Sequence, residues 1–393
     1  MSMSDKYKNT KKPLILIVDD VVRNLQIIGN HLIETGYDIS LAMTGEQALT
    51  TAKLIKPDLI LLDIMMPNMD GYEVCRQLKQ MPETADVPVV FLTAKNDIDD
   101  ILKGFAVGGT DYITKPFHKQ EIKARIKSQI ELKRSRDQLK AFADEINLLN
   151  DKLNSDLSIA AEYFRSLLPE KIDNKSISTY WHYVPTQKLG GDAFGYFMLD
   201  DENFVFYLFD VCGHGIASGL YSVSLLNILR FRNLPNTDFR QPKDVFASLN
   251  KIFQTTSHHG MYFTIWYGVY NIPKRELNYS AAGHHPSVLF NSDDSFSKLD
   301  EGNFIIGGME EYKFKQETLK LEPESELFVF SDGTFEIVKS DGAQWTIDDL
   351  IHFLDTRKDK KASELNNLHN YILGMYGETI QKDDFTILKI VFH

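Results

Sequence analysis

Leu-Leu-Asp-Ile-Met-Met-Pro-Asn-Met-Asp-Gly, the stretch at residues 61–71, starts as an apolar run and ends in residues that break regular structure. Similar apolar runs occur at 14–18 and 87–92, and helix-like amphipathic segments separate them. Continuous apolar runs bounded by turn signals are typical of strands that are buried on both faces of a parallel sheet. Their alternation with helices predicts a doubly wound α/β fold for this region.

Polar residues stand where these predicted strands end. Asp19 and Asp20 directly follow the first strand, and Asp63, Thr93 and Lys115 come at or just after the ends of later ones. Because the carboxyl ends of such strands open on one edge of the sheet, we expect these side chains to converge. Three close carboxylates repel each other, and a Mg²⁺ ion offsets that repulsion. The chemistry that suits this site is phosphoryl transfer to a carboxylate nucleophile.

Four strings together make this region resemble a response-regulator receiver domain, which has a flavodoxin-like fold. They are Leu-Ile-Val-Asp-Asp at 16–20, the stretch at 61–71, Phe-Leu-Thr-Ala at 91–94 and Thr-Lys-Pro-Phe at 114–117. The resemblance covers residues 13–130, the predicted extent of the first domain. It also implies a histidine kinase as the partner that supplies the phosphoryl group.

The resemblance assigns roles to individual residues. It implies that Asp63 is the phosphorylation site. It implies a receiver Mg²⁺ bound by Asp20, Asp63 and the Met65 carbonyl, with Asp19 acting through water, and switch residues Thr93, Lys115 and Tyr112. Gly109 stands where the family usually has alanine, and we expect little consequence from this difference.

A helical linker is predicted over residues 131–168. The chain has neither glycine nor proline from 120 to 168, and apolar residues recur at spacings of three and four. These residues are Leu139, Phe142, Ile146, Leu149 and Leu153. A sustained heptad seam favours a dimeric coiled coil, and hence a homodimer. One amphipathic helix packed on a neighbouring domain is the alternative.

The third region, residues 169–393, has the pattern of an α+β domain. Strands are predicted at 204–209, 262–270, 277–282, 327–330 and 385–391, and helices after Gly215, after Pro242 and at about 362–375. Strands interrupted by a few helices indicate an α+β or sandwich domain with helical flanks.

Four aspartate motifs punctuate this region. They are Gly190-Gly191-Asp192, Asp210 to Gly215, Ser331-Asp332-Gly333 and Asp383-Asp384-Phe385-Thr386. Neither cysteine nor histidine has zinc-like spacing, so an oxygen-only site for Mg²⁺ or Mn²⁺ is predicted. Two such ions can activate a water and clamp a phosphoryl group. The histidines are interpreted as structural: His214 lies in a Gly-His-Gly turn, and adjacent His284 and His285 are expected to point apart.

With these motifs, residues from about 155 to 392 resemble the SpoIIE/RsbU branch of the PPM (protein phosphatase 2C-like) metal-dependent serine/threonine phosphatases. The strings at 160–169, 262–270 and 281–284 also match. The resemblance implies two stacked antiparallel sheets flanked by helices. It implies that Asp210 bridges two metals, one completed by Asp192 and the Val211 carbonyl and the other by Asp332 and Asp383. Gly195 departs from the branch, since many members have a second aspartate there.

Composition bounds the function of the whole chain. A net charge of −12 argues against broad binding to nucleic acid or anionic membranes. Two cysteines and the lack of a long apolar stretch predict a cytoplasmic protein. We therefore expect a two-component response regulator that controls a phosphatase, with an anti-sigma-factor antagonist as the substrate in a partner-switching pathway. A catalytically inactive phosphatase-like adaptor that binds a regulatory protein is the alternative.

Overall fold

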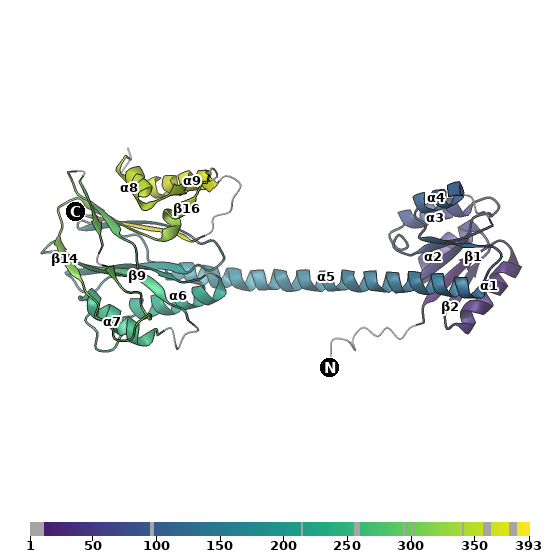
Figure 1. Ribbon diagram of the computed structural model, residues 1–393, viewed down its shortest axis with the longest axis horizontal. Coiled ribbons are helices and arrows are strands. Elements are labelled where there is room, and N and C mark those ends of the chain that lie inside the picture. Colours follow the sequence, from purple (N-terminus) through teal and green to yellow (C-terminus); the bar gives the residue numbers. More distant parts are fainter. Residues whose placement is uncertain are drawn as a thin grey trace. The chain divides into compact units, whose positions relative to one another are not determined.

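The computed structural model divides into two compact units, one ending at Asn150 and the other starting at Asp151 (Figure 1). It describes residues 12–94, 98–213, 215–254, 260–293, 295–300, 302–339, 342–356, 363–376 and 383–393. Each unit has its own sheets and its own hydrophobic cores.

A five-stranded parallel sheet forms the centre of the N-terminal unit. Its strands are β1 (Leu14–Val18), β2 (Asp38–Ala42), β3 (Leu59–Asp63), β4 (Val89–Thr93) and β5 (Asp111–Thr114), in the order β2-β1-β3-β4-β5. The helices between them are α1 (Val22–Glu34), α2 (Gly45–Ile55), α3 (Gly71–Gln80) and α4 (Ile98–Ala106). The predicted doubly wound α/β fold is confirmed. Strand β2 was not predicted, because it lies at the edge of the sheet and only Ala42 is fully buried in it.

Both faces of this sheet are covered by helices, which explains the continuous apolar strands. Leu25 and Ile28 of α1 pack on one face together with Ile122 and Ile126 from the first turns of α5 (Lys119–Leu167). The other face carries α2 and α3, whose buried residues include Ala48, Val74 and Leu78. Buried on both sides, a strand has no solvent face on which polar residues could alternate.

Helix α5 is a single helix of 49 residues, which confirms the predicted helix. Near its end, Ala161 and Phe164 join the core of the C-terminal unit. In its middle, the heptad residues Leu139 and Leu149 are 69% and 60% exposed. A long exposed apolar seam is what a partner helix covers in a coiled coil, so the paired linker stays a prediction.

Two sheets lie face to face in the C-terminal unit. The first contains β7 (Asp192–Met198), β8 (Asn203–Val211), β9 (Phe263–Asn271), β10 (Glu276–Ala282), β13 (Gly302–Asn303) and β14 (Glu317–Lys320). Its path is β13-β10-β9-β8-β7 with β14 also paired to β10, and every pair but β10–β13 is antiparallel. The second sheet is antiparallel, in the order β12 (Phe296–Leu299), β11 (Ser287–Phe290), β15 (Ser325–Phe330), β18 (Phe385–Phe392) and β6 (Ile177–Val184). Strands β16 (Ile337–Val338) and β17 (Gln344–Trp345) form a small separate pair.

Aromatic side chains fill the space between the two sheets. The rings of Phe206 and Trp266 stack with centroids 5.5 Å apart, and Trp266 stacks in turn on Tyr279 at 5.7 Å. Alternate residues of the same strands point outward, where Tyr207 and Phe209 contact α6 and α7. This period-two division of each strand between two cores is what a face-to-face pair of sheets requires.

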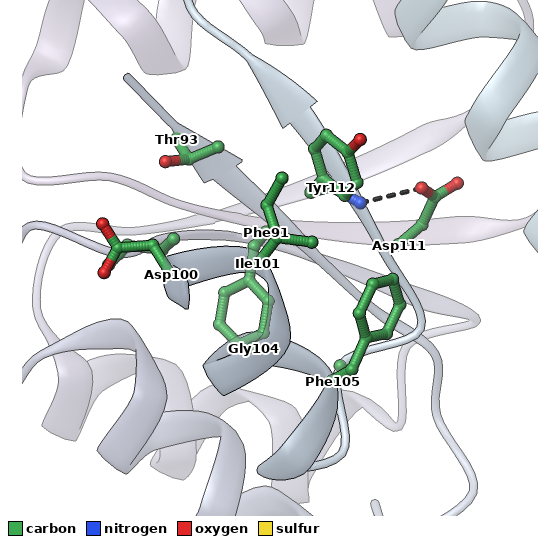
Figure 2. A pocket seen from close by; sticks show the side chains of 10 residues that line it. Phe91, Thr93, Asp100, Ile101, Gly104, Phe105, Asp111 and Tyr112 are labelled. Carbon is green, nitrogen blue, oxygen red and sulfur yellow. Dashed lines mark hydrogen bonds between the residues drawn. The ribbon is translucent and has the colours of Figure 1, made fainter. Parts of the chain in front are cut away.

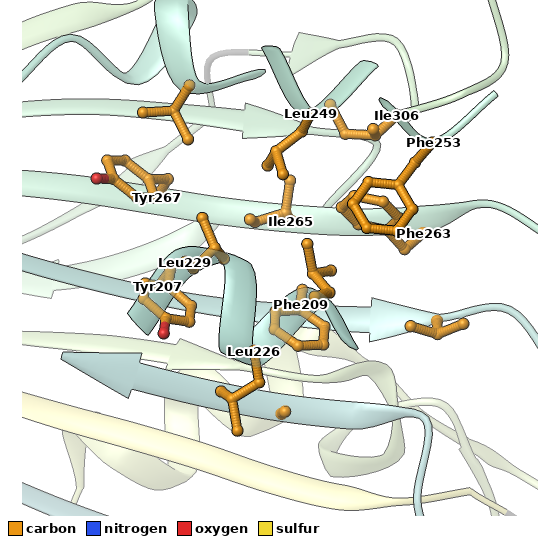
Figure 3. Packing of buried hydrophobic residues seen from close by; sticks show 14 of the residues in the cluster. Tyr207, Phe209, Leu226, Leu229, Leu249, Phe253, Phe263, Ile265, Tyr267 and Ile306 are labelled. Carbon is orange, nitrogen blue, oxygen red and sulfur yellow. The ribbon is translucent and has the colours of Figure 1, made fainter. Parts of the chain in front are cut away.

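Helices cover both outer faces of the pair. Helices α6 (Ile216–Arg230) and α7 (Pro242–Ile252) pack on the first sheet, and Figure 3 shows Leu226, Leu229 and Leu249 against Tyr207 and Ile265. Helices α8 (Ile347–Asp355) and α9 (Ser363–Tyr376) lie on the outer face of the second sheet (Figure 1). The predicted architecture of two sheets flanked by helices is therefore confirmed.

Gly109 in the N-terminal unit allows Phe91 of β4 to pack against the backbone. A Cβ atom at position 109 would lie 2.4 Å from Cε2 of Phe91 and 2.9 Å from the Gly104 carbonyl oxygen. Because Phe91 is 98% buried, its ring has little room to move away. The expectation that glycine here has little consequence is therefore wrong.

We predict that Gly109→Ala lowers the free energy of unfolding by about 1–3 kcal/mol, because the added methyl overpacks a filled core. The free energy of unfolding is measured from the transition of the N-terminal unit in chemical denaturation of the full chain. The matched control is the double variant Phe91→Leu with Gly109→Ala, in which a smaller side chain makes room for the methyl. If the two substitutions are simply additive, the proposed contact does not exist.

Candidate functional site

Three carboxylates meet at the carboxyl edge of the parallel sheet. Asp19 and Asp20 follow β1, Asp63 ends β3, and each offers an oxygen that lies within 4.8 Å of the other two. Thr93 ends β4 and Lys115 follows β5, so the expected convergence of strand ends is present. Such a set of oxygen donors fits a Mg²⁺ ion, whose charge would offset the repulsion among the carboxylates.

Lys115 neutralises part of this acidic cluster. Its Nζ atom lies 2.9 Å from Oδ2 of Asp63 and 3.0 Å from Oδ2 of Asp19. Burial raises the pKa of Asp63, and the hydrogen bond from Lys115 offsets part of that shift. Burial alone would lower the pKa of Lys115, but its hydrogen bonds to Asp63 and Asp19 raise it. The ammonium is thus held charged, beside the oxygens of Asp63.

Asp19 is held by its neighbours and by a residue that the motifs did not single out. Its carboxylate accepts hydrogen bonds from the Val21 N–H at 2.9 Å and from the Asn24 amide at 2.9 and 3.0 Å. Asn24 is in the first turn of α1, and its sequence position carries no clear signal of this role. The Met65 N–H donates to Asp63, while the Met65 side chain is 64% exposed.

The remaining predicted switch residues line a neighbouring pocket between α4 and β5. Thr93 is buried and Tyr112 half-buried, and both border this pocket (Figure 2). The guanidinium of Arg125 lies 5.2 Å from the centre of the Tyr112 ring and binds Asp111 at 2.7 Å. The aromatic side chain is therefore stacked under a cation in this conformation.

In the C-terminal unit, strand pairing brings the first two aspartate motifs together. Asp192 begins β7 and Asp210 lies near the end of β8, and the two are direct cross-strand partners. The Val211 carbonyl is close to the same turn, since a Cβ on Gly191 would lie 2.7 Å from its oxygen. Asp332 follows β15 and Asp383 precedes β18, which is the antiparallel neighbour of β15. Among the contacts that join the two sheets here, the Thr386 hydroxyl donates to Oδ2 of Asp192 at 2.6 Å.

The carboxyls of this unit act strongly on one another. Burial and the charges of Asp332 and Asp383 raise the pKa of Asp210 to about 7. Burial, Asp383 and Glu336 raise the pKa of Asp332 to about 6. The pKa of buried Asp192 is raised by burial and then by Asp210. All four predicted aspartates therefore share one electrostatic environment.

This environment fits divalent cations bound by oxygen. Grouped, partly buried carboxylates are unfavourable unless an opposite charge compensates them, and Mg²⁺ or Mn²⁺ prefers such ligands. The donors are more widely spaced than in the N-terminal unit. Among the described residues, Asp19, Asp20 and Asp63 of that unit form the only group whose ligand atoms all lie within 4.8 Å of one another. A cavity of about 140 Å³ lies at this site and is lined by Asp210, Asp332 and Glu336.

Asp384 and Glu336 belong to this site although the motifs did not assign them a role. Oδ1 of Asp384 accepts hydrogen bonds from the N–H and hydroxyl of Thr186 at 2.8 and 3.0 Å, and Oδ2 accepts one from the Gly191 N–H at 2.7 Å. Asp384 therefore holds the turn that carries Asp192. The doubled aspartate before β18 was the signal for this role, since adjacent residues entering a strand point to opposite sides. Here Asp384 is buried and Asp383 exposed.

Gly195 has a packing role. A Cβ at position 195 would lie 2.4 Å from the hydroxyl oxygen of Tyr207, its cross-strand partner, which is fully buried. An aspartate at this position would displace that ring. The departure from the family pattern is thus matched by a filled core, and position 195 has no space for a metal ligand.

The expectation that His284 and His285 point apart is wrong. Their rings stack with centroids 4.1 Å apart at 22°, and both line the same cavity as Asp210 and Asp332. Nδ1 of His284 lies 2.9 Å from the His285 carbonyl oxygen, which bends the turn so that the rings overlap. Burial lowers the pKa of His284 to about 4, so this ring is neutral near pH 7. His214 lies outside the described residues.

Comparison with known proteins gives the family of each unit. The family model of the response regulator receiver domain matches residues 15–127. The family model of stage II sporulation protein E (SpoIIE) matches residues 200–393. Residues 15–127 belong to the response regulator receivers, and residues 200–393 to the SpoIIE family. The receiver and the SpoIIE-type, PP2C-like domain recognised from the motifs are therefore confirmed.

Curated relatives resemble part of the chain. The DNA-binding dual master transcriptional regulator RpaA of Synechocystis sp. is 37% identical over 155 residues, which are 39% of this chain and 62% of RpaA. The alkaline phosphatase synthesis transcriptional regulatory protein PhoP of Bacillus subtilis is 37% identical over 161 residues, 40% of this chain and 64% of PhoP. The chain thus spans less than two thirds of either relative.

A solved structure resembles the larger part of the chain in fold. The SiaA-PP2C domain of Pseudomonas aeruginosa superposes with a TM-score of 0.54 at 16% identity, over 62% of this chain and 99% of that domain. At this identity the likeness concerns architecture only. Within the described parts of the receiver, α5 and the SpoIIE-type domain, no helix is both long and apolar enough to cross a membrane.

Asp210→Asn tests the repulsion among the carboxyls of the SpoIIE-type domain. The pKa of Asp210 is about 7 when folded, against 3.8 for an unperturbed aspartate, so the folded state binds the proton more tightly. The stability that Asp210 contributes is therefore greatest below pH 4 and is lost as the pH rises to about 7. In metal-free buffer we expect Asp210→Asn to be more stable than wild type at pH 8, by on the order of 2 kcal/mol.

Thermal and chemical unfolding with a chelator at pH 8 and near pH 4 provide the measurement. The advantage of Asp210→Asn should largely disappear near pH 4, because the wild-type carboxyl is then protonated in the folded state and about half protonated in the unfolded state. Added Mn²⁺ should reverse the order at pH 8 by stabilising the wild type alone. A wild type that is already the more stable protein at pH 8 without metal would contradict the proposed repulsion.

Proposed function

We propose that this chain is a two-component response regulator in which phosphorylation of Asp63 controls a metal-dependent protein serine/threonine phosphatase. The carrying observation is the group of mutually repelling carboxyls, Asp192, Asp210, Asp332 and Asp383, on facing ends of two sheets. A family assignment alone gives a fold and a class. The proposal of activity rests on the site that these residues build.

At the receiver, the chain supplies a nucleophile and a cation to receive negative charge. Asp63 is the nucleophile, and its Oδ2 already faces the Lys115 ammonium at 2.9 Å. A phosphoryl group on Asp63 would bring new oxygens within reach of Lys115 and of Thr93 at the end of the next strand. Mg²⁺ bound by Asp20, Asp63 and the Met65 carbonyl, with Asp19 acting through water, would neutralise the entering phosphoryl oxygens.

In the SpoIIE-type domain, the chain's residues hold a phosphoryl group and a water in a site bounded by carboxylates. Two Mg²⁺ or Mn²⁺ ions held by Asp192, Asp210, the Val211 carbonyl, Asp332 and Asp383 would lower the pKa of a bound water and offset phosphoryl charge. Asp384 fixes the turn of Asp192, and Thr386 orients the Asp192 carboxylate. The cavity of about 140 Å³ is large enough for a phosphoryl group and a water.

Partners follow from the two reactions. A histidine kinase would supply the phosphoryl group to Asp63. The substrate of the SpoIIE-type domain would be a protein phosphorylated on serine or threonine, and we propose an anti-sigma-factor antagonist in a partner-switching pathway. We also propose that the protein is cytoplasmic and that it is a homodimer, in which two α5 helices pair through the seam that contains Leu139 and Leu149. In such a dimer, a change in the receiver could reach the second domain through the paired helices.

Turnover of a phosphothreonine peptide with Mn²⁺ tests the catalytic proposal. We expect Asp210→Ala to lower kcat/KM by roughly a hundredfold or more, because loss of a bridging ligand removes several kcal/mol of transition-state stabilisation. Asp201→Ala, at an exposed aspartate in the turn after β7, is the matched control and should keep full activity. Equal, slow turnover by wild type and Asp210→Ala would favour the inactive adaptor.

Beryllofluoride, which mimics a phosphoryl group on Asp63, tests the regulatory link. We expect it to change the kcat/KM of the wild type by about fivefold or more, the usual size of coupling between two sites. Asp63→Asn should not respond, whereas Asp38→Asn, at an exposed residue of β2, should respond as the wild type does. If beryllofluoride does not change the kcat/KM of the wild type, the proposed control of the phosphatase by the receiver is wrong.

A further inference from the structure

A large open groove lies beside the carboxylate site, entirely within the C-terminal unit. Its volume is about 820 Å³, and its walls are the last turns of α5, the loop 185–189 and the start of α6 at Gly215 and Ile216. Pockets of this size accommodate ligands much larger than a phosphoryl group. The groove is therefore larger than the chemistry of the neighbouring cavity requires.

The loop that forms one wall is held at both of its ends, at one by the carboxylate site and at the other by α6. At one end, the N–H and hydroxyl of Thr186 donate to Asp384, the same carboxylate that holds the turn of Asp192. At the other end, Leu189 packs so closely on α6 that a Cβ at Gly219 would lie 2.5 Å from the Leu189 Cβ. A molecule lying in the groove would consequently contact a fixed wall directly beside the catalytic carboxyls.

The charge of the groove is unlike that of the chain. Arg165 of α5 and Lys188 of the loop both line it and are exposed, with Glu162 as the one acidic residue of the lining, in a chain of net charge −12. Neither Arg165 nor Lys188 forms a salt bridge with another described residue. The charge of Arg165 also acts close to the site. Burial and the charges of Asp384 and Asp192 raise the pKa of Tyr183, and the charge of Arg165 opposes part of that rise.

We propose that this groove docks the phosphoprotein substrate, by binding acidic residues that flank its phosphorylated serine or threonine. The inference rests on the proposed phosphatase activity and adds the surface and the sequence preference by which the substrate is recognised. The phosphorylated side chain would enter the cavity of Asp210 and Asp332. Acidic flanking residues would lie in the groove, where Arg165 and Lys188 supply the complementary charge.

Two phosphothreonine peptides and one small substrate test this proposal. One peptide has glutamates on both sides of the phosphothreonine, the other has glutamines, and p-nitrophenyl phosphate reports the chemistry without docking. We expect the wild type to turn over the glutamate peptide with about tenfold higher kcat/KM than the glutamine peptide. Added salt should diminish this advantage, because exposed charges are screened.

The double variant Arg165→Glu with Lys188→Glu should reverse the preference between the peptides. Relative to p-nitrophenyl phosphate, its kcat/KM for the glutamate peptide should fall by about tenfold or more, mainly through KM. Lys152→Glu is the matched control, because Lys152 is an exposed residue of α5 outside the groove lining. It reverses one basic charge, as each of the two substitutions in the double variant does, and should keep the wild-type preference.

The outcomes separate failure of the docking proposal from failure of the proposed function. A wild type that hydrolyses p-nitrophenyl phosphate but has no preference between the peptides, or keeps its preference in the double variant, overturns the docking proposal alone. Analytical ultracentrifugation tests whether a second copy of the chain occupies the groove instead. A double variant with an altered oligomeric state and an unaltered peptide preference would assign the groove to that second copy and overturn the docking proposal. A wild type without turnover of any substrate overturns both proposals.

Discussion

Carboxylates held close together at strand ends repel one another, and each domain of this chain is organised around such a group. In the receiver, the Lys115 ammonium contacts both Asp63 and Asp19 and compensates part of the charge. In the SpoIIE-type domain, burial and then the charges of neighbouring carboxyls raise the pKa of Asp210 to about 7. Such an arrangement of buried carboxylates is unfavourable for the stability of the fold by itself. It becomes favourable when cations bind to the carboxylates and compensate their charge.

Backbone hydrogen bonds keep these carboxylates in place against their repulsion. The two carboxylate oxygens of Asp384 accept hydrogen bonds from Thr186 and Gly191, and these bonds join the start of β18 to the turn before β7. Thr386, two residues later, holds Asp192 itself. Phe206, Trp266 and Tyr279 stack in series in the aromatic layer between the sheets that carry these strand ends. Rigid packing of this kind is what a preorganised site needs.

Helix α5 connects the chemistry of the two domains through one continuous element. Its first turns pack under the receiver sheet through Ile122 and Ile126, and its last turns enter the core of the second domain through Phe164. Those last turns also carry Arg165 on the wall of the groove beside the carboxyl site. A shift of the helix would therefore alter a surface next to that site, which is the physical route we propose for control by phosphorylation.

From the sequence alone, both domains, the long helix and the carboxylate motifs could be predicted. Buried parallel strands are continuous apolar runs, so β1, β3 and β4 were evident, whereas β2 was missed because an edge strand such as this one buries few residues. The motifs named Asp192, Asp210, Asp332 and Asp383 because each of these carboxylates stands at a strand end and most of them stand near glycine. Their roles as metal ligands stay predictions.

Only the tertiary structure decided which side chains support these residues. Contacts between segments far apart in the chain placed Asp384 and Glu336 in the site, and only Asp384 had a local signal, the doubled aspartate before β18. The stacked rings of His284 and His285, and the close packing of Gly109 and Gly195 against Phe91 and Tyr207, contradicted or explained what the sequence suggested. Sequence patterns report the periodicity and chemistry of each segment, but packing between segments depends on shape in three dimensions, which appears only when the chain has folded.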